Sequence, residues 1–133
     1  MVWAHAIILK FGVTNSNSSI ADSLTQQGLD HLAEGAPAEA AKKFRAAIDA
    51  DPAYFEAHHG FVRALRDAGR LEQSVAAALA LTALTPDDPL AHTALSISLQ
   101  YAGHVPEAEA AAARARILEW KVQLQSPSSG DLK

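Results

Sequence analysis

The six histidines are the residues of this chain best suited to metal chemistry, because the sequence contains no cysteine. His58 and His59 are adjacent, so on a helix their side chains point about 100° apart and cannot easily bind one ion together. The sequence has no H-E-x-x-H motif and no pair of histidines four residues apart. We therefore predict no metal site, and we expect His58 and His92 to pack between helices with one ring nitrogen hydrogen-bonded.

The carboxylates offer no catalytic arrangement either. Glu39, Glu72 and Glu107 each fall in the first turn of an expected helix, where the helix dipole favours negative charge. There is no G-x-S-x-G motif and no glycine-rich phosphate loop. The sequence therefore predicts a protein that is not an enzyme and that uses no cofactor.

Charge and hydropathy narrow the class of partner. The net charge is -4 and the basic residues are scattered, so we expect no nucleic-acid binding. The apolar run from Val2 to Val13 is shorter than the ~20 residues of a membrane-spanning helix, so no transmembrane segment is expected. The absence of cysteine leaves the redox compartment open, and the expected location is the cytoplasm.

These residues lie in a sequence that repeats itself. Gly35, Gly69 and Gly103 stand 34 residues apart, and Pro52 and Pro86 mark the same interval. Three segments of this length fit without insertion, and they are residues 21–54, 55–88 and 89–122. A fixed period of this size indicates an array of similar structural repeats that bury their apolar faces against one another.

The first repeat resembles the tetratricopeptide repeat (TPR) pattern of a bulky residue, a small residue four positions on, A-x3-F and a closing proline. The matching residues are Leu24, Gly28, Ala40, Phe44, Ala47 and Pro52. The later repeats depart from it, with His58 and His92 at the first aromatic position, Ala78 at the large one and Trp120 at the last proline. The resemblance implies an all-α fold, a right-handed α-α superhelix of three TPR helix-turn-helix repeats with an extended last helix.

Glycine, proline and capping signals place the helices. The expected ranges are 19–34, 37–50, 54–68, 71–84, 89–102 and 106–124. Small residues at the expected helix crossings act as spacers, namely Gly28, Val62 and Ser96 with Ala40, Ser74 and Ala108.

Three parts of the chain are expected from composition. Residues 1–19 form an apolar N-terminal arm with a polar linker, residues 20–124 the TPR domain, and residues 125–133 a flexible tail. The arm over residues 1–13 is compatible with an extended segment and with two helical turns.

The resemblance implies that ligand contacts come from fixed positions on the first helix of each repeat. The residues at these positions that we assign to a peptide-binding groove are Thr25, Leu29, Leu32, His59, Arg63, Arg66, Thr93, Ile97, Gln100 and Tyr101. Arg63 and Arg66 could hold a carboxylate or phosphate of a ligand, or they could be solvated or paired with Asp67 and Glu56. Family members that bind chaperones use a clamp of lysine, asparagine and arginine, whereas the matching positions here hold Thr25, Leu29, Gly60, Leu90 and Ala94.

Two functions follow from these observations. The first is a non-catalytic protein-protein interaction module that binds a peptide or protein segment in its concave groove, as a scaffold or assembly subunit. The alternative is a structural protein that forms homo-oligomers through the N-terminal arm and the last helix, whose outer face we expect at Ala111, Ala115, Leu118 and Val122. The basic amphipathic end of that helix is also compatible with a membrane surface.

Overall fold

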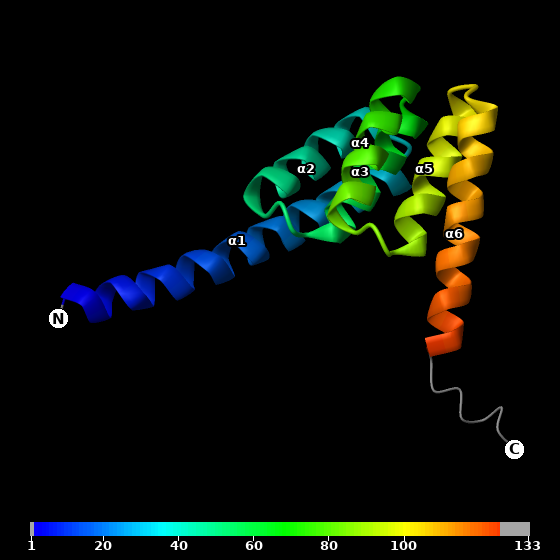
Figure 1. Ribbon diagram of the computed structural model, residues 1–133. Coiled ribbons are helices and arrows are strands. Elements are labelled where there is room, and N and C mark those ends of the chain that lie inside the picture. The colour runs from blue at the N-terminus through cyan, green and yellow to red at the C-terminus, as the bar shows by residue number, and fades with distance from the viewer. Residues whose placement is uncertain (1, 126–133) are drawn as a thin grey trace, which may run out of the picture. The chain divides into compact units, whose positions relative to one another are not determined.

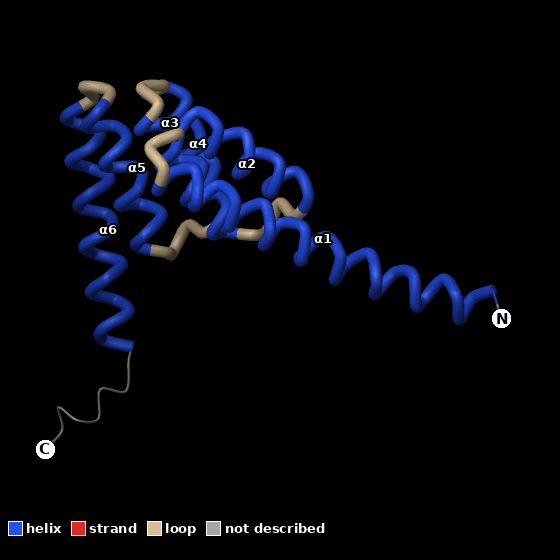
Figure 2. Tube along the Cα trace, turned by 180° about the vertical axis from the view of Figure 1, so that it is seen from behind, coloured by secondary structure: helices blue, strands red, loops and turns tan. Residues whose placement is uncertain are grey.

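The computed structural model describes the backbone of residues 2–125 and the side chains of residues 17–125. Over this part of the chain it contains six helices and no strand. The helices are α1 (Val2–Ala33), α2 (Pro37–Ala50), α3 (Phe55–Asp67), α4 (Leu71–Leu84), α5 (Pro89–Tyr101) and α6 (Val105–Gln125). The predicted all-α fold is confirmed, and α6 is the extended last helix. Figure 2 shows short loops between the helices.

The chain divides into two compact units, unit 1 (residues 1–69) and unit 2 (residues 70–133). In unit 1, α1 packs against α2, and α3 packs against both of them. In unit 2, α5 packs between α4 on one side and α6 on the other. Figure 1 labels all six helices.

The three glycines of the 34-residue ladder end the first helix of each repeat in the same way. Gly35, Gly69 and Gly103 have φ of 78°, 79° and 89°, the left-handed region that glycine adopts without steric cost. Their amides donate to carbonyls three residues back, at Leu32, Arg66 and Gln100, over 3.0 to 3.1 Å. This is the αL turn that closes a helix and pairs its last carbonyls.

The starts of α2 and α5 follow the predicted signals. Pro37 and Pro89 open α2 and α5, where a missing amide proton costs nothing. Asp88 caps α5, because its carboxylate accepts a hydrogen bond of 3.0 Å from the amide of Leu90. The ranges of α2 and α4 match the prediction residue for residue.

An aromatic ring held between glycines forms the centre of unit 1. Phe44 of α2 is fully buried, and a Cβ added to Gly28 of α1 would lie 2.7 Å from its ring. A Cβ on Gly60 of α3 would meet the same ring. The ring therefore fills the space that these two glycines leave, and the three helices approach closely around it.

Small residues and paired hydroxyls fill unit 2. The hydroxyls of Ser74 and Ser98 lie 2.6 Å apart in the interior, and Ser96 donates to the carbonyl of Ala108 over 2.8 Å. All six predicted spacer positions are buried. Each buried hydroxyl named here therefore has a partner, as burial of a polar group requires.

The two repeated histidines close the turns between repeats. Nε2 of His58 lies 2.8 Å from the carbonyl oxygen of Pro52, and Nε2 of His92 lies 2.8 Å from that of Pro86. A carbonyl can only accept, so Nε2 carries a proton in both rings and donates it. The expectation that each ring has a hydrogen-bonded nitrogen is confirmed.

Two expectations differ from the structure. Helix α1 begins at Val2 and not near Ser19, so the polar residues 14–19 are helical backbone. Asparagine, serine and threonine are only weakly unfavourable in helices, and this tract contains no glycine or proline to end one. The division into arm, TPR domain and tail stays a prediction, and residues 126–133 of the tail lie outside the described residues.

The second difference concerns α6. Ala111, Ala115 and Leu118, which we expected on its outer face, are 3 to 7% exposed and face α5, whereas Val122 is exposed. Both faces of α6 carry apolar residues, so periodicity could not tell the inner face from the outer one. In the range that the structure describes, no helix combines the length and apolar character needed to cross a bilayer.

Candidate functional site

Helix α1 contributes three of the predicted groove residues, and they differ in how far their side chains are exposed. Leu29 and Leu32 are partly exposed. Thr25 is 1% exposed and its hydroxyl has no hydrogen-bond partner among the described residues. Its side chain is packed inside, so the assignment of Thr25 to a ligand-contacting surface is corrected. The family position that suggested Thr25 takes no account of the packing around α1.

Helix α3 carries the basic part of the candidate site. His59, Arg63 and Arg66 are spaced four and three residues apart, which places them on one side of the helix. Nε of Arg63 lies 3.6 Å from Oδ2 of Asp67, and both side chains are exposed. An exposed pair of this kind contributes only about 0–1 kcal/mol, so a ligand carboxylate can replace Asp67 at little cost. His59 and Arg66 are half-buried and already hold interactions within the protein.

A hydrogen bond that the sequence did not predict joins the start of α3 to the second half of α1 in unit 1. The hydroxyl of Tyr54, the cap residue of α3, donates to Oδ1 of Asp22 in α1 over 2.6 Å. This hydrogen bond, together with burial and the negative charges of Asp22 and Glu56, raises the pKa of Tyr54 to about 12. Tyr54 therefore ties α3 to α1, the two helices that carry the candidate residues of unit 1.

Helix α5 carries the predicted residues of unit 2. Thr93, Ile97, Gln100 and Tyr101 are all exposed, with Ile97 at 36% and Tyr101 at 63%. Their spacing of four, three and one places them on one side of α5. The prediction that they lie on the surface agrees with the structure, and their role in binding stays a prediction.

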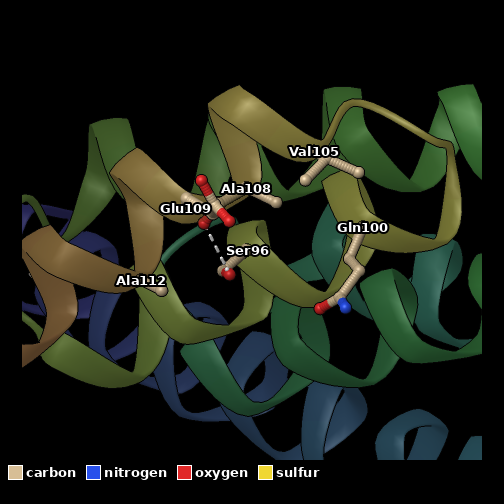
Figure 3. Close-up of a pocket in the computed structure, with 6 residues that line it drawn as sticks. All are labelled: Ser96, Gln100, Val105, Ala108, Glu109 and Ala112. Atoms are coloured by element: carbon tan, nitrogen blue, oxygen red, sulfur yellow. Dashed lines mark hydrogen bonds between the residues drawn. The ribbon is translucent and has the colours of Figure 1, made fainter.

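A small pocket between α5 and α6 was not predicted. It has a volume of about 120 Å³ and is lined by Ser96, Gln100, Val105, Ala108, Glu109 and Ala112. Figure 3 shows these six side chains, with the hydrogen bond from Ser96. Ala112 is two repeats after Phe44, so a methyl group stands where unit 1 has a ring. Aligning the repeats could have located this pocket, because it places Ala112 at the position of Phe44.

The described side chains give no arrangement for a metal ion. In the part of the chain with described side chains, no three His, Cys, Asp or Glu residues come close enough together to hold one. An imidazole-carboxylate contact joins Nε2 of His104 to Oε2 of Glu72 over 2.9 Å at the surface of unit 2. Such a contact fixes the loop before α6 to the start of α4 and needs no catalytic interpretation.

Comparison with known proteins gives the family and the fold. A family model described as tetratricopeptide repeat matches residues 31–97. No curated protein sequence matches the chain. Three similar solved structures are 16 to 18% identical to it, and at such identities the likeness shows the fold.

The first of these is the second TPR of Spaghetti (RPAP3) bound to the HSP90 peptide SRMEEVD, with a TM-score of 0.71 at 18% identity, covering 79% of this chain and 97% of that chain. The second is the type III secretion translocator chaperone SycD of Yersinia enterocolitica in an alternative dimer. Its TM-score is 0.71 at 17% identity, and the match covers 86% of this chain and 84% of that chain. The third is MamA, with a TM-score of 0.72 at 16% identity, covering 80% of this chain and 62% of that chain.

Proposed function

Because this chain belongs to the tetratricopeptide repeat family, we propose that it is a non-catalytic protein-protein interaction module. We place its ligand, a peptide or a protein segment, on the first helices of the repeats: on α1 and α3 in unit 1, or on α5 in unit 2. The observation that carries the proposal is the row of exposed and partly exposed side chains at equivalent positions of these helices. We propose that it acts as a scaffold or assembly subunit.

The chemistry of the row indicates the kind of peptide. Arg63 offers a planar donor whose present partner, Asp67, is solvated and easily replaced. Leu29 and Leu32 on α1 offer apolar contact in the same unit, and Ile97 with Tyr101 does so on α5. A peptide with a carboxylate beside apolar side chains fits the combination in unit 1.

The peptide is expected to differ from that of the similar Spaghetti domain, which is bound to an HSP90 peptide. At the positions where the family's carboxylate clamp has lysine, asparagine and arginine, this chain has uncharged residues. Thr25 is buried and Gly60 has no side chain. Recognition of a carboxylate here therefore depends on the α3 arginines.

The test is fluorescence anisotropy with labelled short peptides that carry a carboxylate beside apolar side chains and contain proline, so that they form no amphipathic helix. Arg63→Ala with Arg66→Ala is expected to weaken binding at least tenfold, the effect of losing about 1.4 kcal/mol, with unchanged circular dichroism. The matched control is Lys42→Ala with Arg45→Ala, which removes two cations from exposed ion pairs on α2. Equal affinity of the arginine variant and the wild type would remove the groove proposal.

Self-assembly is the second candidate, and the length of α1 favours it. Helix α1 has 32 residues, whereas α2, which packs along it, has 14. The first half of α1 therefore extends past its neighbour in unit 1 (Figure 1). Light scattering on the full chain and on a version without residues 1–17 tests this idea. A monomer in both cases excludes assembly through α1.

A further inference from the structure

Helix α6 carries an apolar stripe, half-buried at Ala113 and exposed from Ile117 onward, that the binding row above does not include. The stripe consists of Ala113, Ile117, Trp120 and Leu124, spaced four, three and four residues apart. Trp120 is 66% exposed and Leu124 is 73% exposed. Ala113, Arg116, Ile117 and Trp120 line a shallow depression of about 360 Å³. This spacing is the a and d pattern of a coiled-coil seam.

The stripe lies on the side of α6 opposite to its packed side. Ala111, Ala115 and Leu118 face α5 and are buried. At 100° per residue, the centre of the stripe lies about 160° around the helix axis from the centre of these three residues. Packing in unit 2 therefore does not require apolar residues on the stripe.

The repeats supply an internal comparison for this surface. Positions 113 and 117 are two repeats after Arg45 and Asp49, which form an exposed ion pair of 3.6 Å on α2. The corresponding pair on α2 is charged, and Arg45 also lies over the ring of Phe61 in α3, at 6.0 Å from its centroid, whereas α6 has alanine and isoleucine there and α4 has exposed Leu79 and Ala83. The fold accepts charged as well as apolar residues at this place, so the argument for docking rests on the exposed Trp120 and Leu124 and on the charge of the flanks.

The flanks of the stripe are basic. Arg114, Arg116 and Lys121 are exposed at the positions next to the stripe, the e and g positions of a coiled coil. Within the described residues, no carboxylate forms an ion pair with any of them. A second copy of α6 would bring Arg116 opposite Arg116 or Lys121 in either direction of pairing, and like charges at these positions are unfavourable. The occupant must therefore be acidic at its flanks.

We propose that the stripe on α6 is a docking site for an acidic amphipathic helix of a partner protein. The partner helix places apolar side chains along Ile117, Trp120 and Leu124, with one large side chain in the depression beside Arg116. Its aspartates or glutamates pair with Arg114, Arg116 and Lys121. A membrane fits less well, because the stripe covers only about 60° of the helix, narrower than the broad apolar face of helices that lie in lipid.

Trp120 is a direct reporter for this docking. The chain has two tryptophans, and Trp3→Phe leaves Trp120 alone. The probes are two synthetic peptides of about four heptads with leucine at a and d, one with glutamate and one with lysine at e and g. The glutamate peptide is expected to bind and to shift Trp120 emission to shorter wavelength, and the lysine peptide is expected to do neither.

Ala113→Arg with Ile117→Asp copies the ion pair of α2 onto α6 and is compatible with the fold. It is expected to weaken binding of the glutamate peptide at least tenfold, as loss of a central apolar contact does. The matched control, Leu79→Arg with Ala83→Asp, puts the same pair at the equivalent exposed positions of α4 and should bind like the wild type.

Replacing Arg114, Arg116 and Lys121 by glutamate should reverse the preference between the two peptides. Binding should survive Arg63→Ala with Arg66→Ala, which separates this site from the proposed groove.

Several results would overturn the proposal. Equal binding of both peptides would rule out charge as the cause of recognition. An unchanged affinity of the α6 ion-pair variant for the glutamate peptide would rule out the stripe as the binding surface. Self-association in sedimentation that only the α6 ion-pair variant loses assigns the surface to a second copy. A shift of Trp120 emission with phosphatidylserine vesicles but not with the glutamate peptide assigns it to membranes.

Discussion

The ring of Phe44 occupies the place that a side chain at Gly28 would need, with 2.7 Å between ring carbons and a Cβ added there. A Cβ on Gly60 from the other side would meet the same ring. Van der Waals contact between carbon atoms needs about 3.5–4.0 Å, so neither helix can carry a larger residue without moving. The closeness of α1, α2 and α3 in unit 1 thus depends on three residues together.

Gly28→Ala is therefore expected to destabilise the protein by about 1–3 kcal/mol through overpacking, although alanine has the better helix propensity. Chemical denaturation followed by circular dichroism measures this. Phe44→Leu in the Gly28→Ala background should recover part of the loss, because the smaller side chain makes room. Gln27→Ala, at an exposed neighbouring position, serves as the control and should change stability by less than about 0.5 kcal/mol. A neutral Gly28→Ala variant would contradict the tight contact.

The αL glycines are expected to behave alike. No atom lies within 4 Å of an added Cβ at Gly35, Gly69 or Gly103, so substitution meets no steric clash with neighbours. Alanine at each position should cost about 1–2 kcal/mol, which is the backbone cost of the left-handed conformation. Asparagine should cost less, since it adopts this conformation more readily. Denaturation midpoints of the six variants test the expectation, and a cost that is absent for alanine would contradict the stated geometry.

The buried serine pair predicts a non-additive result. Ser74→Ala removes the partner of the Ser98 hydroxyl, 2.6 Å away, and should cost about 1–3 kcal/mol. The double variant with Ser98→Ala removes the unpaired group as well, so it should be less destabilised than the sum of the single variants. A thermodynamic cycle from denaturation curves measures this coupling. Additive effects would show that the two hydroxyls do not depend on each other.

Tyr54 predicts a loss of stability in alkali. Its pKa is about 12 in the folded protein because it donates to Asp22, against about 10 in an unfolded chain. Its contribution is fully present below about pH 10 and is lost as the pH rises through about 12, because only the folded state holds the proton more tightly. Ultraviolet titration of tyrosinate and denaturation over this pH range measure both effects. Tyr54→Phe should remove the titration near pH 12; if it remains, Tyr54 is not its source.

The helices were predictable because local signals and the 34-residue period agree. Gly69 separates α3 from α4, and Pro37 marks the first residue of α2. Each of these signals acts within one turn of helix, so it can be read without tertiary structure. The same holds for the cap at Asp88.

The inner and outer sides of α6 and the contacts of single side chains were not predictable. Apolar residues on two faces of α6 give two equally good seams, and only packing against α5 decides between them. The burial of Thr25 and the pairing of Tyr54 with Asp22 depend on how α1, α2 and α3 meet. The start of α1 was missed because weak propensities of polar residues do not end a helix.

The Nε2 proton of His58 reports whether the turn after Pro52 in unit 1 is closed, and that of His92 does the same for the turn after Pro86 in unit 2. A ring that donates to Pro52 or Pro86 keeps a proton on Nε2, whereas a ring released into water has no such requirement. Imidazole nitrogen resonances therefore distinguish a closed turn from local opening, separately at residues 52–58 and 86–92. Comparing the two signals during mild denaturation would show which of the two turns opens first.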